Sequence, residues 1–398
     1  MKLSRSRRVY CLSVLTDFAY MLFIFVITRR LAESGANPFQ LGILGTASSL
    51  SYALGCTVAG RLSDRLGRRR LILLGAALQI TGFLLASHWQ SRLVTYLLTA
   101  VVGANAGLIY PPAIAWLTEG AHHSQQTTGT IRKLLFFCIA WNLGIIIGQM
   151  SGGWLFSLSR GLPMEVSAAA MVLVVILVWR PAPEPDDELE RQAPPARHVT
   201  PERARAFVYL AWTSNVASAL SVSMIIYLFP YLAEKLAISP PTHGMMLASQ
   251  RAVVIIMFLL MWRFTFWQYR LATALIVQGV GIAGLLLLTT GTTVLVLTAG
   301  VMLVGVLGGY NYFASIFYST TGFADDQKVT ASGMHETTLA VGFGAGAVLG
   351  GLVGTYLGGR ASYLFCALAI VISSVIQIAM FASWRRRWAM AKPRRSNH

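Results

Sequence analysis

Apolar segments long enough to cross a membrane repeat along almost the whole chain. They lie near residues 9–28, 39–60, 71–91, 93–117, 133–157 and 163–179, and again near 206–233, 243–262, 271–290, 293–319, 329–358 and 361–384. A bilayer core of about 30 Å needs roughly 20 apolar residues in a helix. The pattern therefore predicts an all-α membrane protein with twelve transmembrane helices in two groups of six.

Two polar segments divide this pattern. The uncharged stretch 271–324 is too long for one crossing, and the cluster of threonines around Gly291 predicts a turn within it. The segment 181–205 is rich in proline and acidic residues, so it cannot bury enough apolar surface to fold. We therefore expect an N-terminal six-helix bundle (1–180), a cytoplasmic linker (181–205) and a C-terminal six-helix bundle (206–398).

Charge is scarce and unevenly placed. Only 12% of residues are charged, although the net charge is +17; a soluble domain has about 25%. The basic residues cluster at the ends of apolar segments and form no continuous basic face, which argues against nucleic-acid binding. If both termini are cytoplasmic, most of the 32 lysines and arginines lie inside, as the positive-inside rule requires. The basic residues left outside are Arg29, Arg30, Arg92, Arg160, Lys235 and Arg360.

A weak internal repeat relates the two groups of helices. The fifth segment contains Gly144, Gly148, Gly152 and Gly153, and the eleventh contains Gly342, Gly346, Gly350 and Gly351 at the same spacing. Small residues at every fourth position let helix backbones approach closely. Repeats of this kind are common in transporters, whose substrate sites lie at the interface between repeats near the membrane midplane.

Four ionisable residues lie within the apolar segments: Asp17, Arg251, His335 and Glu336. Each costs about 2.5–3.5 kcal/mol at a helix centre, so few are expected without a role. Asp17 and Glu336 are candidates to carry a proton or to bind a cationic substrate, and Arg251 is a candidate counter-ion or anion clamp. Structural pairing is the alternative for each, and His335 can equally be a packing residue. Neighbouring positions are about 100° apart on a helix, so His335 and Glu336 should face different ways.

Uncharged polar residues extend this candidate pathway. Asn142, Asn215, Tyr227 and Asn311 each lie within an apolar segment. Any one of them can simply pack or form an interhelical hydrogen bond. Together they predict a cavity with aromatic walls and few charges.

A short motif between the second and third segments is the most specific signal. It reads Gly60-Arg61-Leu62-Ser63-Asp64-Arg65-Leu66-Gly67-Arg68-Arg69. It resembles the loop 2–3 signature of the major facilitator superfamily, G-x-[LVI]-[AS]-D-R-x-G-R-R. The glycines suit a tight turn, and Asp64 can accept hydrogen bonds from a helix N-terminus or pair with an arginine.

The resemblance implies a fold and a mechanism. Members of the superfamily move small solutes by rocking two six-helix halves, and most are monomers. Gly60, Asp64, Arg65, Gly67, Arg68 and Arg69 would form a latch that holds the halves together in the outward-facing state. There is some similarity to the drug–proton antiporter branch. Thr99 and Gln149, however, stand where that branch has an arginine and a proline.

We therefore expect a secondary transporter of a small organic solute in the inner membrane, with proton coupling through Asp17 and Glu336. A uniporter in which the carboxylates only bind substrate or Arg251 remains open, and so does a non-transporting receptor on the same fold. The chain has no Walker loop, no Gly-x-Ser-x-Gly motif and no histidine-rich metal cluster. We accordingly expect no enzymatic activity, cofactor or metal, with the substrate, protons and membrane lipid as partners.

Overall fold

The computed structural model describes residues 4–89, 91–117, 127–179, 199–323 and 328–390. The N-terminal half contains α1 (Arg5–Glu33), α2 (Pro38–Leu66), α3 (Arg68–His88), α4 (Arg92–Leu117), α5 (Thr127–Leu158) and α6 (Leu162–Trp179). The C-terminal half contains α7 (Pro201–Tyr227), α8 (Phe229–Lys235), α9 (Pro240–Arg263), α10 (Leu271–Thr290), α11 (Val294–Thr321), α12 (Lys328–Tyr356) and α13 (Ala361–Met390). In these ranges twelve helical segments are long and apolar enough to cross a membrane, with α7 and α8 counted as one.

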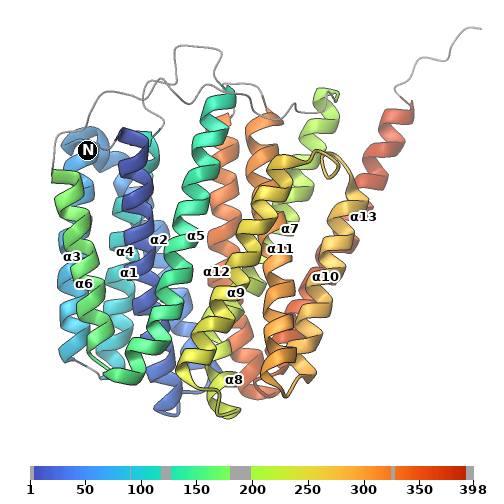
Figure 1. The fold of residues 1–398 in the computed structure, drawn as a ribbon. Helices are drawn as coiled ribbons and strands as arrows, with labels where there is room; N and C mark the ends of the chain where they lie inside the picture. Colours follow the sequence, from blue (N-terminus) through green and yellow to red (C-terminus); the bar gives the residue numbers. More distant parts are fainter. Residues whose placement is uncertain (1–3, 90, 118–126, 180–198, 324–327, 391–398) are drawn as a thin grey trace, which may run out of the picture.

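The helices lie side by side, with α1–α6 on one side of the molecule and α7–α13 on the other (Figure 1). The first helix begins and the last helix ends at the same end of the bundle, which we call the terminal end. The short helix α8 lies at the opposite end, which we call the α8 end. Large apolar side chains on the periphery are exposed, as in Leu54 (67%) and Ile276 (68%), which suits contact with lipid.

Helix ends follow local sequence signals. Asn37 and Gln40 form a reciprocal capping box at the start of α2, with Pro38 in the first turn. The predicted turn around Gly291 is confirmed, because α10 ends at Thr290 and α11 begins at Val294 with Thr293 as its cap.

Two helix ends differ from the expectation. Helix α2 continues past residue 60 to Leu66, because Gly67 is the first residue there to leave the helical conformation, with φ 83°. Gly60 therefore lies inside a helix, and the turn to α3 is Gly67 alone. Helix α7 begins at Pro201 within the predicted linker, since proline is well accommodated in a first turn. The rest of the linker up to residue 198 lies outside the described residues.

The glycine repeat positions equivalent helices in the two halves. Gly148 of α5 lies against α1, where a Cβ would be 2.6 Å from the Phe18 carbonyl oxygen. Gly346 of α12 lies against α7, where a Cβ would be 2.7 Å from the Leu220 carbonyl oxygen. The last glycine of each repeat contacts the other half of the molecule. Gly153 lies against Pro240 of α9, and Gly351 lies against Pro38 of α2. The two halves thus use the same packing internally and against each other.

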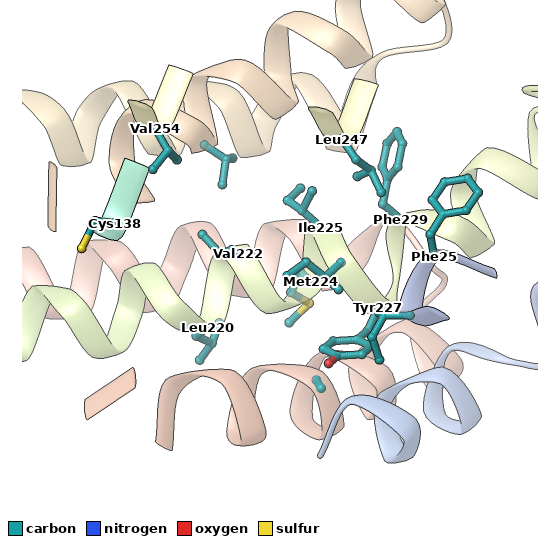
Figure 2. Packing of buried hydrophobic residues seen from close by; sticks show 14 of the residues in the cluster. Phe25, Cys138, Leu220, Val222, Met224, Ile225, Tyr227, Phe229, Leu247 and Val254 are labelled. Atoms are coloured by element: carbon teal, nitrogen blue, oxygen red, sulfur yellow. The ribbon is translucent and has the colours of Figure 1, made fainter. Parts of the chain in front are cut away.

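A cluster of aromatic side chains lies at the interface between the halves near the α8 end. Phe25 of α1 and Phe229 of α8 lie close together there (Figure 2). Both rings pack against buried His243 of α9, with centroid distances of 4.8 and 5.5 Å. The Phe25–His243 contact therefore joins the two halves at the α8 end.

Candidate functional site: a cavity between the two halves

A cavity of about 270 Å³ lies between the halves at mid-depth. Its wall is built from α1, α2, α4 and α5 on one side and α7, α9, α11 and α12 on the other. The lining is mostly apolar and aromatic. The aromatic members are Tyr20, Tyr52, Tyr110, Phe137, Trp141, Tyr227, Phe258, Tyr312 and Phe343.

Three of the four predicted charged residues line this cavity: Asp17, Arg251 and Glu336. Asp17 is 7% exposed and faces Tyr110 of α4, while Arg251 of α9 is close enough for its charge to act on the Asp17 carboxylate. Because Asp17 and Arg251 come from different halves, their interaction depends on how the halves are placed. The cavity contains two carboxylates and one guanidinium, so its formal charge is negative when both acids are ionised.

Glu336 and His335 differ sharply in burial, although His335 Nε2 lies 3.9 Å from Glu336 Oε1. The Glu336 side chain is 57% exposed because it projects into the open cavity. His335 is 1% exposed and lies behind the wall, where its Nδ1 is 2.8 Å from Ser315 Oγ of α11. Its ring also packs against Tyr312 at 5.0 Å. Glu336 is therefore the titratable group of α12 that reaches the cavity.

Of the four predicted amide and phenol residues, two line the cavity and two are buried behind its wall. Asn215 and Tyr227 of α7 line the cavity, and Asn215 Nδ2 donates to Thr338 Oγ1 of α12 at 2.9 Å. Asn142 is fully buried and donates to the Cys138 carbonyl within its own helix at 2.8 Å. Asn311 is also fully buried. The structure thus places Asn142, Asn311 and His335 behind the wall, although all three lie near the depth of the site.

Several wall residues were not singled out from the sequence. The Tyr20 hydroxyl bonds to Ser48 Oγ and links α1 with α2, and Tyr227 from the other half lies beside this pair. Tyr312 of α11 reaches across to Trp141 of α5, with ring centroids 5.8 Å apart. The one available signal was spacing, because Tyr20 follows Asp17 by three positions and shares its helix face.

The α8 end of the cavity is closed by contacts between the halves. Arg29 of α1 forms an ion pair with Glu234 of α8 at 2.9 Å. The Phe39 amide donates to Thr355 Oγ1 at 2.9 Å, and Thr46 Oγ1 donates to the Gly344 carbonyl at 2.8 Å, both between α2 and α12. Glu336 is nevertheless 57% exposed, so these contacts do not cover its side chain.

The loop 2–3 motif lies at the terminal end, outside the cavity. Arg68 Nη1 donates to the Ala115 carbonyl near the end of α4 at 2.9 Å, and Arg69 Nε donates to the Val178 carbonyl near the end of α6 at 2.7 Å. These contacts join helices of the same half and complement helix C-termini. Arg65 is exposed at the end of α2. The Asp64 side chain lies outside the described part of the structure, so the expected latch contact of this residue is not visible.

Nothing in the cavity has the form of a metal centre. Within the described ranges, no three histidine, cysteine, aspartate or glutamate side chains come together as metal ligands would. The arrangement offers aromatic surface, hydroxyl groups and two carboxylates of different exposure. Of the two carboxylates, the exposed one is that of Glu336.

Comparison with known proteins assigns the family. The family model described as Major Facilitator Superfamily matches residues 9–214, more than half of the chain. The multidrug resistance protein MdtH of Aeromonas salmonicida (strain A449) is 24% identical over 364 residues, covering 88% of this chain and 85% of that protein. The quinolone resistance protein NorA of Staphylococcus aureus (strain MRSA252) is 24% identical over 166 residues, covering 40% of this chain and 41% of NorA.

Solved structures share the fold at low sequence identity. The nucleoside transporter NupG superimposes with a TM-score of 0.72 at 12% identity, covering 95% of this chain and 99% of NupG. A bacterial homologue of the human lysosomal transporter Spinster, described as inward-facing and occupied, gives 0.72 at 14% identity over 94% of this chain and 96% of its own. With twelve membrane-length helices arranged as in these proteins, the chain belongs to the major facilitator superfamily and is an integral, multi-pass membrane transporter.

Proposed function

We propose that this transporter exports a small amphipathic organic solute across the cytoplasmic membrane by alternating access, driven by protons that enter. The observation that carries the proposal is the open Glu336 carboxylate in an aromatic cavity at the interface of the two halves. A solvent-accessible acid at that depth can exchange protons with one side of the membrane at a time.

The cavity wall supports the substrate class. Aromatic side chains surround the space, and flat organic molecules bind well against such faces. Two carboxylates outnumber the single guanidinium of Arg251, which favours neutral or cationic solutes over anions. The similar proteins MdtH and NorA are named as resistance proteins, which agrees with export of such compounds.

The distribution of basic residues supports the orientation. The terminal end holds most lysines and arginines, including Arg65, Arg68 and Arg69, so we place this end in the cytoplasm. The structure then corresponds to an inward-open state, with the α8 end closed toward the outside. One chain encloses the whole cavity, which supports a monomer as the working unit.

The two acids then have different parts in the cycle. Glu336 exchanges its proton with the cytoplasm in this state, and the solute competes for the same space. Asp17 and Arg251 lie on different halves, so rocking would separate them and leave each charge to be compensated by a proton or by the solute. In the outward-open state, the motif around Asp64 would hold the terminal end closed, as its resemblance to the superfamily implies.

The test is transport by purified protein in proteoliposomes with an imposed pH gradient, using ethidium and a quinolone as probes. We expect gradient-driven movement by the native chain and loss of gradient dependence in Glu336→Gln. Thr337→Ala, one position further along the same helix, should transport normally. Unaltered proton dependence in Glu336→Gln would refute the assignment of this carboxylate.

A facilitator without proton coupling is the second candidate. The proximity of Arg251 to Asp17 favours it, because a charge-compensated pair needs no proton. The same proteoliposomes separate the two functions. Downhill movement of the probe that ignores the pH gradient in the native chain would establish the facilitator.

A further inference from the structure

A second cavity lies at the α8 end, entirely within the N-terminal half. It has a volume of about 410 Å³ and shares no lining residue with the central cavity. Its wall comes from the last turns of α1, the start of α4 and the turn between α5 and α6. We call it the arginine pocket, and its lining residues are Ile27, Arg30, Leu31, Glu33, Ser34, Ser91, Arg92, Thr95 and Arg160.

Arg30 is the buried charge of this pocket. It is only 9% exposed, and its hydrogen bonds go to backbone carbonyls, from Nη1 to Ala86 at 3.4 Å and from Nη2 to Arg160 at 2.6 Å. Its Nε is buried without a hydrogen-bond partner. A carbonyl accepts a hydrogen bond but does not neutralise a cation, so this guanidinium retains both its charge and an unused donor.

The other charges leave the pocket positive. Arg92 donates from Nη2 to the Ser34 carbonyl at 2.6 Å, and Arg160 is 63% exposed. Glu33 is the acid in the lining, but it is shared between Arg160 at 3.4 Å and Arg29 outside the pocket at 3.0 Å. Three guanidinium groups thus line the pocket, and the single carboxylate in its lining is also paired with an arginine outside it.

Helix capping alone explains only part of this arrangement. Arginines often bind the last carbonyls of helices, and Arg360 does so for α10 through the Thr289 carbonyl at 2.9 Å. Capping needs one arginine for each helix end and does not require a cavity between three of them. The first turn of α4 also borders the pocket, and the N-terminus of a helix of this length attracts anions.

We propose that the arginine pocket binds a phosphate group on the face of the membrane opposite the termini. Guanidinium groups bind phosphate through paired hydrogen bonds, and Arg30, Arg92 and Arg160 all line this one space. The phosphate belongs either to a free anion or to the headgroup of an anionic phospholipid. In the second case Ile27 and Leu31 provide apolar surface beside the headgroup.

The first arm of the test uses inorganic phosphate and purified full-length protein. Thermal unfolding is followed during a phosphate titration at constant ionic strength, balanced with chloride. The variants are Arg92→Gln/Arg160→Gln, Arg160→Gln alone in case the double variant does not fold, and Arg360→Gln as a capping arginine outside the pocket. We expect the phosphate midpoint to weaken at least tenfold in the pocket variants and to stay unchanged in Arg360→Gln.

The second arm uses nanodiscs of phosphatidylcholine with or without phosphatidylglycerol, followed by native mass spectrometry of the released protein. Retention of phosphatidylglycerol by the native chain and Arg360→Gln, but not by the pocket variants, would identify a lipid headgroup as the source. A response in the first arm alone would identify a free anion. If neither arm separates the pocket variants from Arg360→Gln, the proposal is wrong.

Discussion

Two buried side chains of opposite charge, Asp17 and Arg251, line the cavity from different halves of the molecule. Each is less than a tenth exposed, so removal of one leaves the other charge in a medium that solvates it poorly. Their interaction is therefore visible in stability as well as in transport.

A double-mutant cycle tests this interaction. We expect Asp17→Asn and Arg251→Gln each to lower the unfolding temperature of the purified protein. The double variant should lose less than the sum, with a coupling energy on the order of 1 kcal/mol, because the charge of Arg251 acts on the Asp17 carboxylate. Strictly additive losses would show that the two charges do not interact.

From the sequence, the depth of a residue along its helix was predicted better than the face of the helix on which it lies. Asp17, Arg251 and Glu336 were expected at mid-depth, and the structure brings them to one cavity. The positions of Asn142, Asn311 and His335 behind the wall were not predictable, because helices that are apolar on every side give no signal of rotation. The same limit hid Tyr312, whose contact with Trp141 depends on the tilt of two helices.

At the scale of the helix, close packing depends on positions without a side chain. The glycines of α5 pack against α1, and the glycines of α12 pack against α7. Both glycine repeats can be recognised in the sequence. The long extension of α2 to Leu66 cannot, since hydropathy reports where the membrane ends and not where a helix ends.

Substitution of a glycine by alanine, which adds one methyl group, tests this packing. Gly148→Ala and Gly346→Ala would each bring a Cβ within 2.7 Å of backbone atoms on the neighbouring helix. We expect each to cost about 1–3 kcal/mol, the usual range for overpacking, and to lower the unfolding temperature. Gly279→Ala on α10 enters open space and should be neutral or slightly stabilising. Equal effects at all three glycines would contradict the packing argument.

At the scale of the molecule, the Arg29–Glu234 ion pair joins the halves at the α8 end. Glu234→Gln should favour the state in which this end opens. The Glu234 side chain is 38% exposed, so the pair contributes about 1 kcal/mol at most and the populations should change up to about fivefold. Spin labels at Leu66 and Arg263, at the terminal ends of α2 and α9, would report the change as a shorter distance between the halves.

The neighbouring variant Lys235→Gln is the control, since Lys235 lies over the Tyr231 ring of its own half. Its distance distribution should match that of the native chain. A Glu234→Gln distribution that also matches would show that the ion pair does not influence the balance between states.

The contacts at Gly42, Gly153 and Gly351 bring main chain of one half directly against main chain of the other. No bulky group stands at these points that could swing aside on its own to admit a molecule at the α8 end. Passage at this face consequently requires whole helices to part. A leak through thermal motion of single residues is disfavoured, and the barrier to solute and protons stays intact until the entire half has turned.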